Sequence, residues 1–197
     1  MPPVLALRRR GEHVLVHRAR DLLWAVRLSV AGGGALCVAG LIDRTAQWPL
    51  VTATLGPTAY VFAAHPASRT ATRRNAVVGH SVAIAAALAS LAVFGLWDER
   101  PHAAVGHVTL PQVFATAVAV AVTLFILEVT DHHHAPSAAS AVLITAGFTP
   151  PGKPLYGLIC GIALIIAISP VLAAAPPGAV TEAQRRRAAG GKGEGGN

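Results

Sequence analysis

The hydrophobic positions of this chain fall into six blocks, separated by polar or proline-containing stretches. Four blocks are long and two are short; they cover about residues 22–42, 76–97, 111–130 and 154–175, and about residues 49–64 and 135–148. A helix of ~20 apolar residues, rising 1.5 Å per residue, spans the ~30 Å hydrocarbon core of a bilayer. The pattern therefore predicts an all-α, polytopic transmembrane protein with six helical segments.

Composition supports this prediction and excludes a soluble globular domain. The chain has 197 residues, 53% of them hydrophobic and 13% charged, with a mean hydropathy of +0.54. Soluble domains have ~25% charged residues. We expect three regions: a basic cytoplasmic segment at 1–21, a transmembrane domain at 22–175 and a disordered cytoplasmic tail at 176–197.

The net charge of +7 is carried almost wholly outside the apolar blocks. Basic residues gather at both chain ends and in the loop 65–75, which holds Arg69, Arg73 and Arg74 and no acid. This distribution favours a lipid bilayer as partner over a nucleic acid, and it places both termini and this loop in the cytoplasm if all six segments cross an inner membrane. Whether the two short segments cross or re-enter stays open at this point.

The order long, short, long occurs twice and suggests an internal repeat. The short segments contain "GPTAYVFAA" (56–64) and "AASAVLITA" (138–146), which align with Thr58 opposite Ser140. Three crossings per copy would give a 3+3 inverted repeat, an arrangement that recurs in secondary transporters.

Prolines mark both short segments. Gly56-Pro57 interrupts the first and Pro136 begins the second. Proline either kinks a helix or leaves backbone N–H groups unpaired, and such groups at a helix N-terminus suit an anion.

Ionisable residues within or beside apolar segments are functional candidates because burying charge is costly. They are His80, Glu128, Asp131 and the run from His132 to His134. Glu128 with His132, and Asp131 with His134, have helical spacing and are candidate metal ligands, although three adjacent histidines point in different directions. Alternatively, His80 and His134 converge on one vestibule and handle protons.

Two further patterns bear on function. The sequence has no Walker A loop, no Ser-x-x-Lys and no HExxH, so we expect a protein that is not an enzyme and that needs no cofactor. Gly157 and Gly161 form a GxxxG pattern, which allows close helix approach either inside the chain or in a homo-oligomer.

Two stretches resemble the HPP family of small integral membrane proteins. The family's His-Pro-Pro motif, followed by small residues, corresponds to "HAPSAASAV" (134–142), with Ala135 and Ala138 replacing a proline and a glycine. The family's second motif corresponds to "GPT" (56–58), "PAS" (66–68) and "RNAVVGH" (74–80). The resemblance covers about residues 22–175 and implies a small-molecule permease, since some plastid relatives are associated with nitrite transport.

Together these features give a leading hypothesis, a permease for a small inorganic anion such as nitrite, working by proton-sensitive alternating access. The candidate substrate-binding residues are Gly56, Thr58, Arg74, Asn75, His80, His134, Ser137 and Ser140. The alternatives are a membrane metal-binding protein or sensor, or a non-transporting membrane scaffold. The metal candidates are Glu128, Asp131, His132, His133 and His134.

Overall fold

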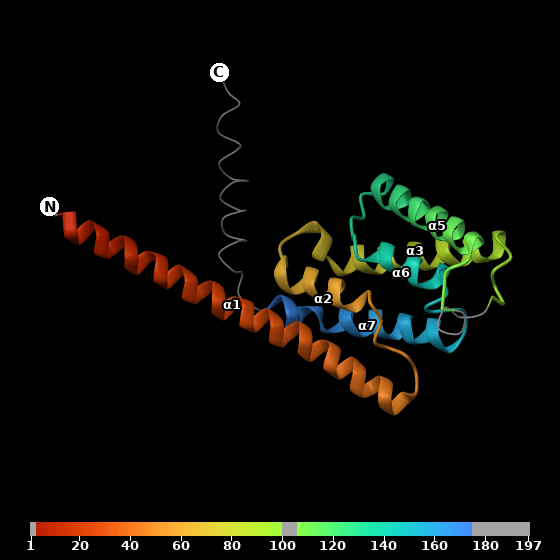
Figure 1. The fold of residues 1–197 in the computed structure, drawn as a ribbon, viewed down its shortest axis with the longest axis horizontal. Helices are drawn as coiled ribbons and strands as arrows, with labels where there is room; N and C mark the ends of the chain where they lie inside the picture. The colour runs from red at the N-terminus through yellow and green to blue at the C-terminus, as the bar shows by residue number, and fades with distance from the viewer. Residues whose placement is uncertain (1–2, 100–105, 175–197) are drawn as a thin grey trace, which may run out of the picture.

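The computed structural model describes residues 3–99 and 106–174, with side chains from residue 22 onward, and all of the regular secondary structure in these ranges is helical (Figure 1). The elements in chain order are α1 (Pro3–Ala46), α2 (Leu55–Ala64), η1 (Arg69–Ala71), α3 (Arg73–Val93), α5 (Leu110–Val129), α6 (Ser137–Thr145) and α7 (Lys153–Ala173). The predicted all-α class is confirmed. The predicted tail at 176–197 lies outside the described residues.

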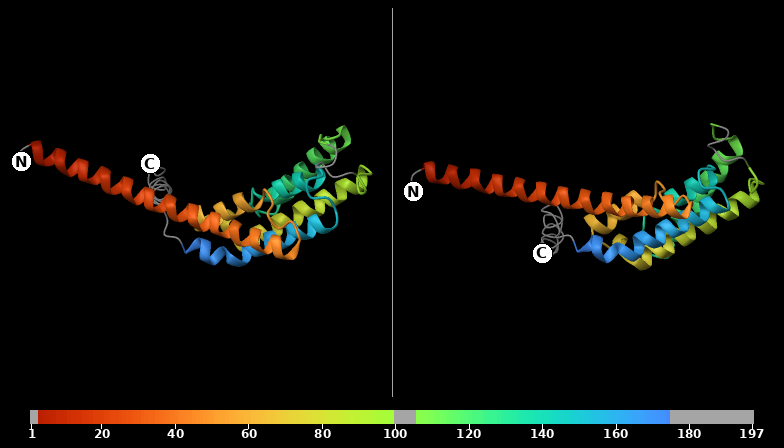
Figure 2. Two further views of the ribbon diagram at one scale, coloured as in Figure 1. Left: turned by 60° about the horizontal axis from the view of Figure 1, so that its bottom comes forward. Right: turned by 90° about the horizontal axis from the view of Figure 1, so that it is seen from below.

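Among the residues that the structure describes, four helices are long and apolar enough to cross a membrane. These stretches are Leu22–Ala46, Arg73–Val93, Leu110–Val129 and Lys153–Ala173, close to the four long blocks of the sequence. The first belongs to α1, whose backbone runs without a break from Pro3, so the expected boundary after residue 21 does not interrupt the helix. As Figure 2 shows, α1 extends well beyond the other helices.

The two short helices are shorter than their apolar blocks. Helix α2 has 10 residues and α6 has 9, so each is only about 15 Å long, half of the hydrocarbon thickness. Non-helical linkers at 47–54 and 130–136 precede them. The expectation that Gly56-Pro57 interrupts a helix is wrong: both residues lie in the first turn of α2, where a proline removes no helical hydrogen bond.

Successive helices run in alternating directions. In Figure 1, α1, α3 and α6 run one way, α2, α5 and α7 the other, and the ends of α1 and α7 that lead to the chain termini lie at the same end of the bundle. Each of α1, α2 and α3 is therefore antiparallel to its counterpart in α5, α6 and α7. This is the relation that a 3+3 inverted repeat requires.

The buried faces of α2 and α6 match position by position. Each helix buries its first, fourth, fifth, eighth and ninth residues. The matching pairs are Leu55 and Ser137, Thr58 and Ser140, Ala59 and Ala141, Phe62 and Ile144, and Ala63 and Thr145. These pairs keep the alignment that the two sequences suggested.

The same alignment carries on into α3 and α7. These helices are the most enclosed of the four long ones, with 39% and 44% of their apolar windows buried, against 11% for α1 and 28% for α5. The matching buried pairs are Ala76 and Leu158, Gly79 and Gly161, His80 and Ile162, Ala83 and Ile165, Ala87 and Ser169, and Ser90 and Leu172. The two halves of the chain therefore share one packing scheme.

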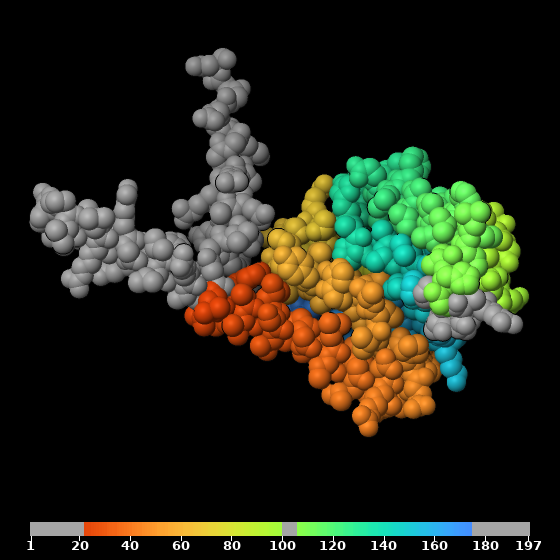
Figure 3. Space-filling model, viewed as in Figure 1, coloured from red at the N-terminus to blue at the C-terminus, as the bar shows by residue number. Residues whose placement is uncertain are grey.

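The helices pack as two bodies that do not coincide with the two repeats. Helices α1, α2 and α7 contact one another, and so do α3, α5 and α6, whereas α3 and α7 make the main helix contact between the two groups. Each repeat thus gives its third helix to the other body. In Figure 3, α1 and α5 lie on opposite sides of the molecule, with the short helices between them.

Gly157 and Gly161 are buried and serve packing inside the chain. A Cβ atom added at Gly157 would overlap the carbonyl of Pro49, and one added at Gly161 would overlap the carbonyl of Leu50. The linker before α2 therefore lies directly against α7. Of the two uses that the GxxxG pattern allowed, packing inside the chain or in a homo-oligomer, the structure shows the first at these glycines.

The close approach at α7 predicts that Gly161→Ala destabilises the protein by about 1–3 kcal/mol, because the linker backbone must shift to admit the methyl group. Thermal unfolding of the detergent-solubilised protein measures this effect. Gly33→Ala is the matched control, since its added Cβ meets no atom within 4 Å and alanine is the better helix former. Equal destabilisation by both substitutions would contradict the packing described here.

Candidate functional site

The His80 ring lies at the meeting point of three helices. It projects from α3, its Nδ1 is 2.9 Å from Ser140 Oγ on α6, and its Nε2 is 3.4 Å from Thr58 Oγ1 on α2. All three side chains are at most 1% exposed. Thr58 and Ser140 occupy equivalent positions in the two repeats, so matching hydroxyls flank the two nitrogens of one imidazole.

The directions of these hydrogen bonds fix the His80 tautomer. The Thr58 hydroxyl donates to the carbonyl of Thr54 at 2.8 Å, so toward His80 it can only accept. The ring therefore carries its proton on Nε2 and donates it to Thr58, while Nδ1 accepts from the Ser140 hydroxyl. Every polar atom in this chain of bonds is satisfied with a neutral ring.

His134 lies beside His80, on the linker just before α6. Its Nδ1 is 2.8 Å from the carbonyl of Thr70 in η1. A carbonyl only accepts, so Nδ1 carries the proton and Nε2 of the neutral ring has the lone pair. That Nε2 atom is buried and has no hydrogen-bond partner among the residues that the structure describes.

Small and aromatic neighbours hold the two rings together. The His80 and His134 centroids are 5.2 Å apart in an edge-to-face arrangement, and the Phe62 ring lies 6.1 Å from His134. Gly79 admits this packing, because a Cβ atom there would lie 3.1 Å from both His134 Cβ and Ser137 Oγ. Ser137 in turn donates to the His134 carbonyl at 2.7 Å.

Only one of the two equivalent helix interfaces carries a histidine. On the interface of α3 with α6, His80 packs near Ser137 and Ser140. Their counterparts on the interface of α7 with α2 are Ile162, Leu55 and Thr58. The repeat therefore supplies two similar backbones but a single imidazole site.

The backbone N–H groups near the site are already engaged. Thr58 N–H donates to Thr54, and the first N–H groups of α6 donate to carbonyls three residues earlier, at 3.0–3.2 Å. The expectation that these groups are unpaired and receive an anion is therefore not supported. The polar groups that the site presents are hydroxyls and imidazoles.

The remaining candidate residues lie outside the histidine pair. Arg74 is exposed at the start of α3. Asn75 donates from its side chain to the Arg69 carbonyl at 2.9 Å, and its backbone N–H is capped by Thr72, so it shapes the turn before α3. Gly56 lies in an apolar, open groove of about 620 Å³, whose other lining residues are Pro57, Tyr60, Val61, Ala135, Pro136 and Ala139.

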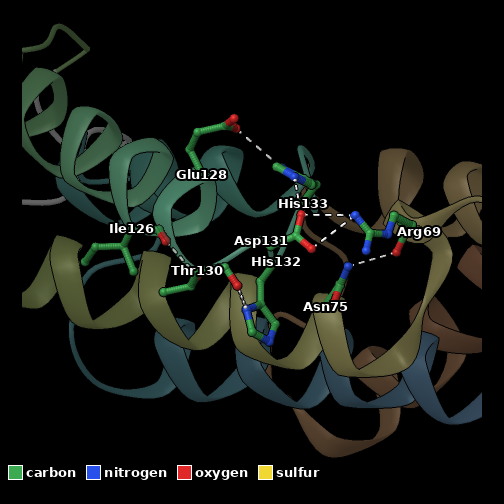
Figure 4. Close-up of polar contacts among 8 residues, drawn as sticks. All are labelled: Arg69, Asn75, Ile126, Glu128, Thr130, Asp131, His132 and His133. Atoms are coloured by element: carbon green, nitrogen blue, oxygen red, sulfur yellow. Dashed lines mark hydrogen bonds and ion pairs between the residues drawn. The ribbon is translucent and has the colours of Figure 1, made fainter.

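The metal candidates do not form one cluster. Figure 4 shows His133 between two carboxylates, with Nε2 3.0 Å from Asp131 and Nδ1 3.4 Å from Glu128, while His132 turns away. The Nδ1 atom of His132 instead lies 2.6 Å from the carbonyl of Thr130. Asp131 also pairs with Arg69 at 3.1 Å. Within the described residues, no three His, Cys, Asp or Glu side chains are placed to share a metal ion.

Sequence reasoning found both histidines but missed three of their neighbours. Phe62 looked like any apolar residue, and the role of Thr70 is played by its backbone carbonyl. Gly79 could have been recognised, because a glycine directly before a candidate buried histidine has no side chain and lets another segment of the chain pack closely there.

The fold and this site define a polytopic helical membrane protein with a buried imidazole pair between inverted repeats. The family model described as HPP, transmembrane region, matches residues 16–175. The chain therefore belongs to the HPP family, as the sequence motifs indicated. No curated protein and no solved structure matched the chain.

The bonding around His80 predicts that Ser140→Ala destabilises the protein by about 1–3 kcal/mol, because it leaves a buried acceptor nitrogen unpaired. Chemical or thermal unfolding measures the loss. Thr123→Val is the matched control: its buried hydroxyl only adds a bond to the Ala119 carbonyl of its own helix, so its removal leaves no group unsatisfied. Similar losses in both variants would argue against a structural role for the Ser140 bond.

Proposed function

We propose that this protein is a permease for a small inorganic anion, with nitrite as the candidate substrate. The supporting observation is the buried pair of His80 and His134, whose one unpartnered polar atom, Nε2 of His134, is available to a ligand. Buried ionisable groups at membrane depth are costly and mark transport or proton pathways. Membership of the HPP transmembrane family is consistent with such a role.

Alternating access in this proposal is a movement of the two helix bodies. Within the body formed by α3, α5 and α6, Ser140 holds His80 at 2.9 Å. Across the boundary between the two bodies, Thr58 Oγ1 on α2 lies at the longer distance of 3.4 Å from Nε2 of the same ring. The weaker bond breaks first when the bodies rotate, and the imidazole pair is then open to one side of the membrane. This differs from rocking one repeat against the other, because each body contains helices from both repeats.

The proposed orientation places the loop 65–72 in the cytoplasm of a cell with an inner membrane. Arg69, Arg73 and Arg74 are exposed at this end, and the end of α7 that leads to the C-terminus lies at the same end of the bundle (Figure 1). The positive-inside rule favours this orientation. The same arginines raise the local concentration of anions at the mouth of the site.

This proposal assigns no enzymatic reaction and no cofactor to the chain. The metal-binding alternative loses support because His132, His133 and His134 turn to three different partners. The scaffold alternative does not account for two imidazoles and two hydroxyls enclosed together at the core.

Transport by purified protein in proteoliposomes tests the proposal. Uptake of nitrite should exceed that of empty liposomes, which is the essential control because nitrous acid crosses lipid unaided. The double variant His80→Ala with His134→Ala should lose at least about tenfold in protein-dependent rate, equivalent to about 1.4 kcal/mol of lost interaction.

The matched control removes the two neighbouring histidines instead. The double variant His132→Ala with His133→Ala deletes the same number of imidazoles from the same region, outside the buried pair, and should transport at nearly the original rate. Equal rates in both double variants would remove the proposed role of His80 and His134. No uptake above empty liposomes for nitrite, nitrate, formate or chloride would overturn the permease assignment.

A further inference from the structure

The site offers an incoming ligand a proton acceptor and no fixed positive charge. Among the described residues, His80 and His134 are the only titratable side chains that are buried, and every Arg and Lys is exposed. The groups around His134 are the neutral His80 ring from α3, Phe62 from α2, the Thr70 carbonyl from η1 and Ser137 from α6. The nearest charged residues along the chain, Arg69 and Asp131, are exposed and form an ion pair with each other.

A bare anion gains little from such a site. Its charge would be enclosed among apolar groups and facing the lone pair of Nε2, which repels it. The ligand that matches an unpartnered acceptor is a donor, and the smallest donor form of an inorganic anion is its protonated acid. Satisfying Nε2 also removes the one unpaired nitrogen of the pair.

We propose that this site takes up the anion of a weak oxyacid together with one proton, which is held at Nε2 of His134. The inference rests on the proposed permease function and specifies its substrate class. In the bound state the O–H bond of the acid breaks as an N–H bond forms at Nε2, leaving an imidazolium beside the oxyanion. Release on the other side reverses this transfer, so acid leaves as it entered and no net charge crosses.

The two histidines have different roles in this step. Nδ1 of His134 keeps its proton throughout, because it donates to the Thr70 carbonyl at 2.8 Å. Only Nε2 therefore gains and loses a proton. Both nitrogens of His80 are bonded to hydroxyls, so neither is free to take up the proton. His80 is a positioning residue, because its ring packs edge-to-face against the ring of His134.

Selectivity follows from how well the proton is shared. The oxyanion of a weak acid, such as nitrite or formate, binds a proton far more strongly than the anion of a strong acid does, so it shares the proton of the imidazolium in a stronger charge-assisted hydrogen bond. The anion of a strong acid, such as nitrate, leaves a fully separated ion pair in an apolar enclosure, whose desolvation is costly. Nitrite and nitrate differ little in size, so they form a matched pair of probes.

Equilibrium binding to the full chain in lipid nanodiscs tests the inference without the leak of free acid through liposomes. If one proton is taken up with each anion, the apparent affinity for nitrite and for formate falls about tenfold for each unit by which the pH rises. The affinities are measured between about pH 6 and about pH 8. Calorimetry in two buffers with different ionisation heats should show one proton taken up per anion. Nitrate should bind at least about tenfold more weakly than nitrite at the lower pH.

Two variants separate the proton acceptor from general disruption. In His134→Asn the side-chain amide nitrogen can take the place of Nδ1 and still donate to the Thr70 carbonyl. The variant has no proton-accepting atom at the position of Nε2. Anion binding should then be lost and the accompanying proton uptake should disappear. His132→Asn is the control: Nδ1 of His132 also donates to a backbone carbonyl, that of Thr130, yet His132 lies outside the pair, so binding should be unchanged.

Each other outcome has a definite meaning. Affinity for nitrite that does not change with pH, or nitrate binding as tight as that of nitrite, overturns the weak-acid inference and leaves the anion permease standing. Proton-linked binding that survives in His134→Asn overturns the assignment of the proton to Nε2. No binding of any of these anions at any pH overturns the permease itself.

Discussion

The burial of two imidazoles at one helix junction is the constraint on which the rest of this structure depends. A buried ring nitrogen without a partner is costly, so the surrounding helices must bring hydroxyls and carbonyls to it. Ser140, Thr58 and the carbonyl of Thr70 meet this requirement for three of the four ring nitrogens, from α6, α2 and η1. Gly79 completes the arrangement by admitting the linker that carries His134. The positions of the two short helices are thereby tied to the chemistry of α3.

The two repeats share their helix packing but differ in the side chains at the equivalent junctions. Both halves place a glycine at the same point, Gly79 in α3 and Gly161 in α7, and in each case a linker packs against it. One linker brings His134 to a histidine, whereas the other brings Leu50 and Leu55 to an isoleucine. Two equivalent packing schemes therefore yield one junction with two histidines and one junction without any. The junction with the histidines holds the candidate ligand groups.

Much of this arrangement could be predicted from the sequence, and the remainder could not for physical reasons. The four spans follow from block length, and the equivalence of Thr58 and Ser140 was visible in two aligned segments. The length of α2 could not be predicted. Residues 49–54 belong to the same apolar block as the helix, yet they form a non-helical linker that packs against Gly157 and Gly161. The orientation of His134 depends on a backbone carbonyl, which no residue type reveals. The glycine pattern in α7 fits internal and external packing equally well until the linker is placed.

The exchange of third helices between the two bodies also sets an order of assembly. Helices α3, α5 and α6 are consecutive along the chain, so their body can close while synthesis is still in progress. Helices α1 and α2 are made first, yet their body lacks its third member until α7, the last helix, emerges. Contacts between segments that are distant along the chain form slowly. The two helices that are synthesised first are thus the last to complete their packing, because their body lacks its third helix until α7 is in place.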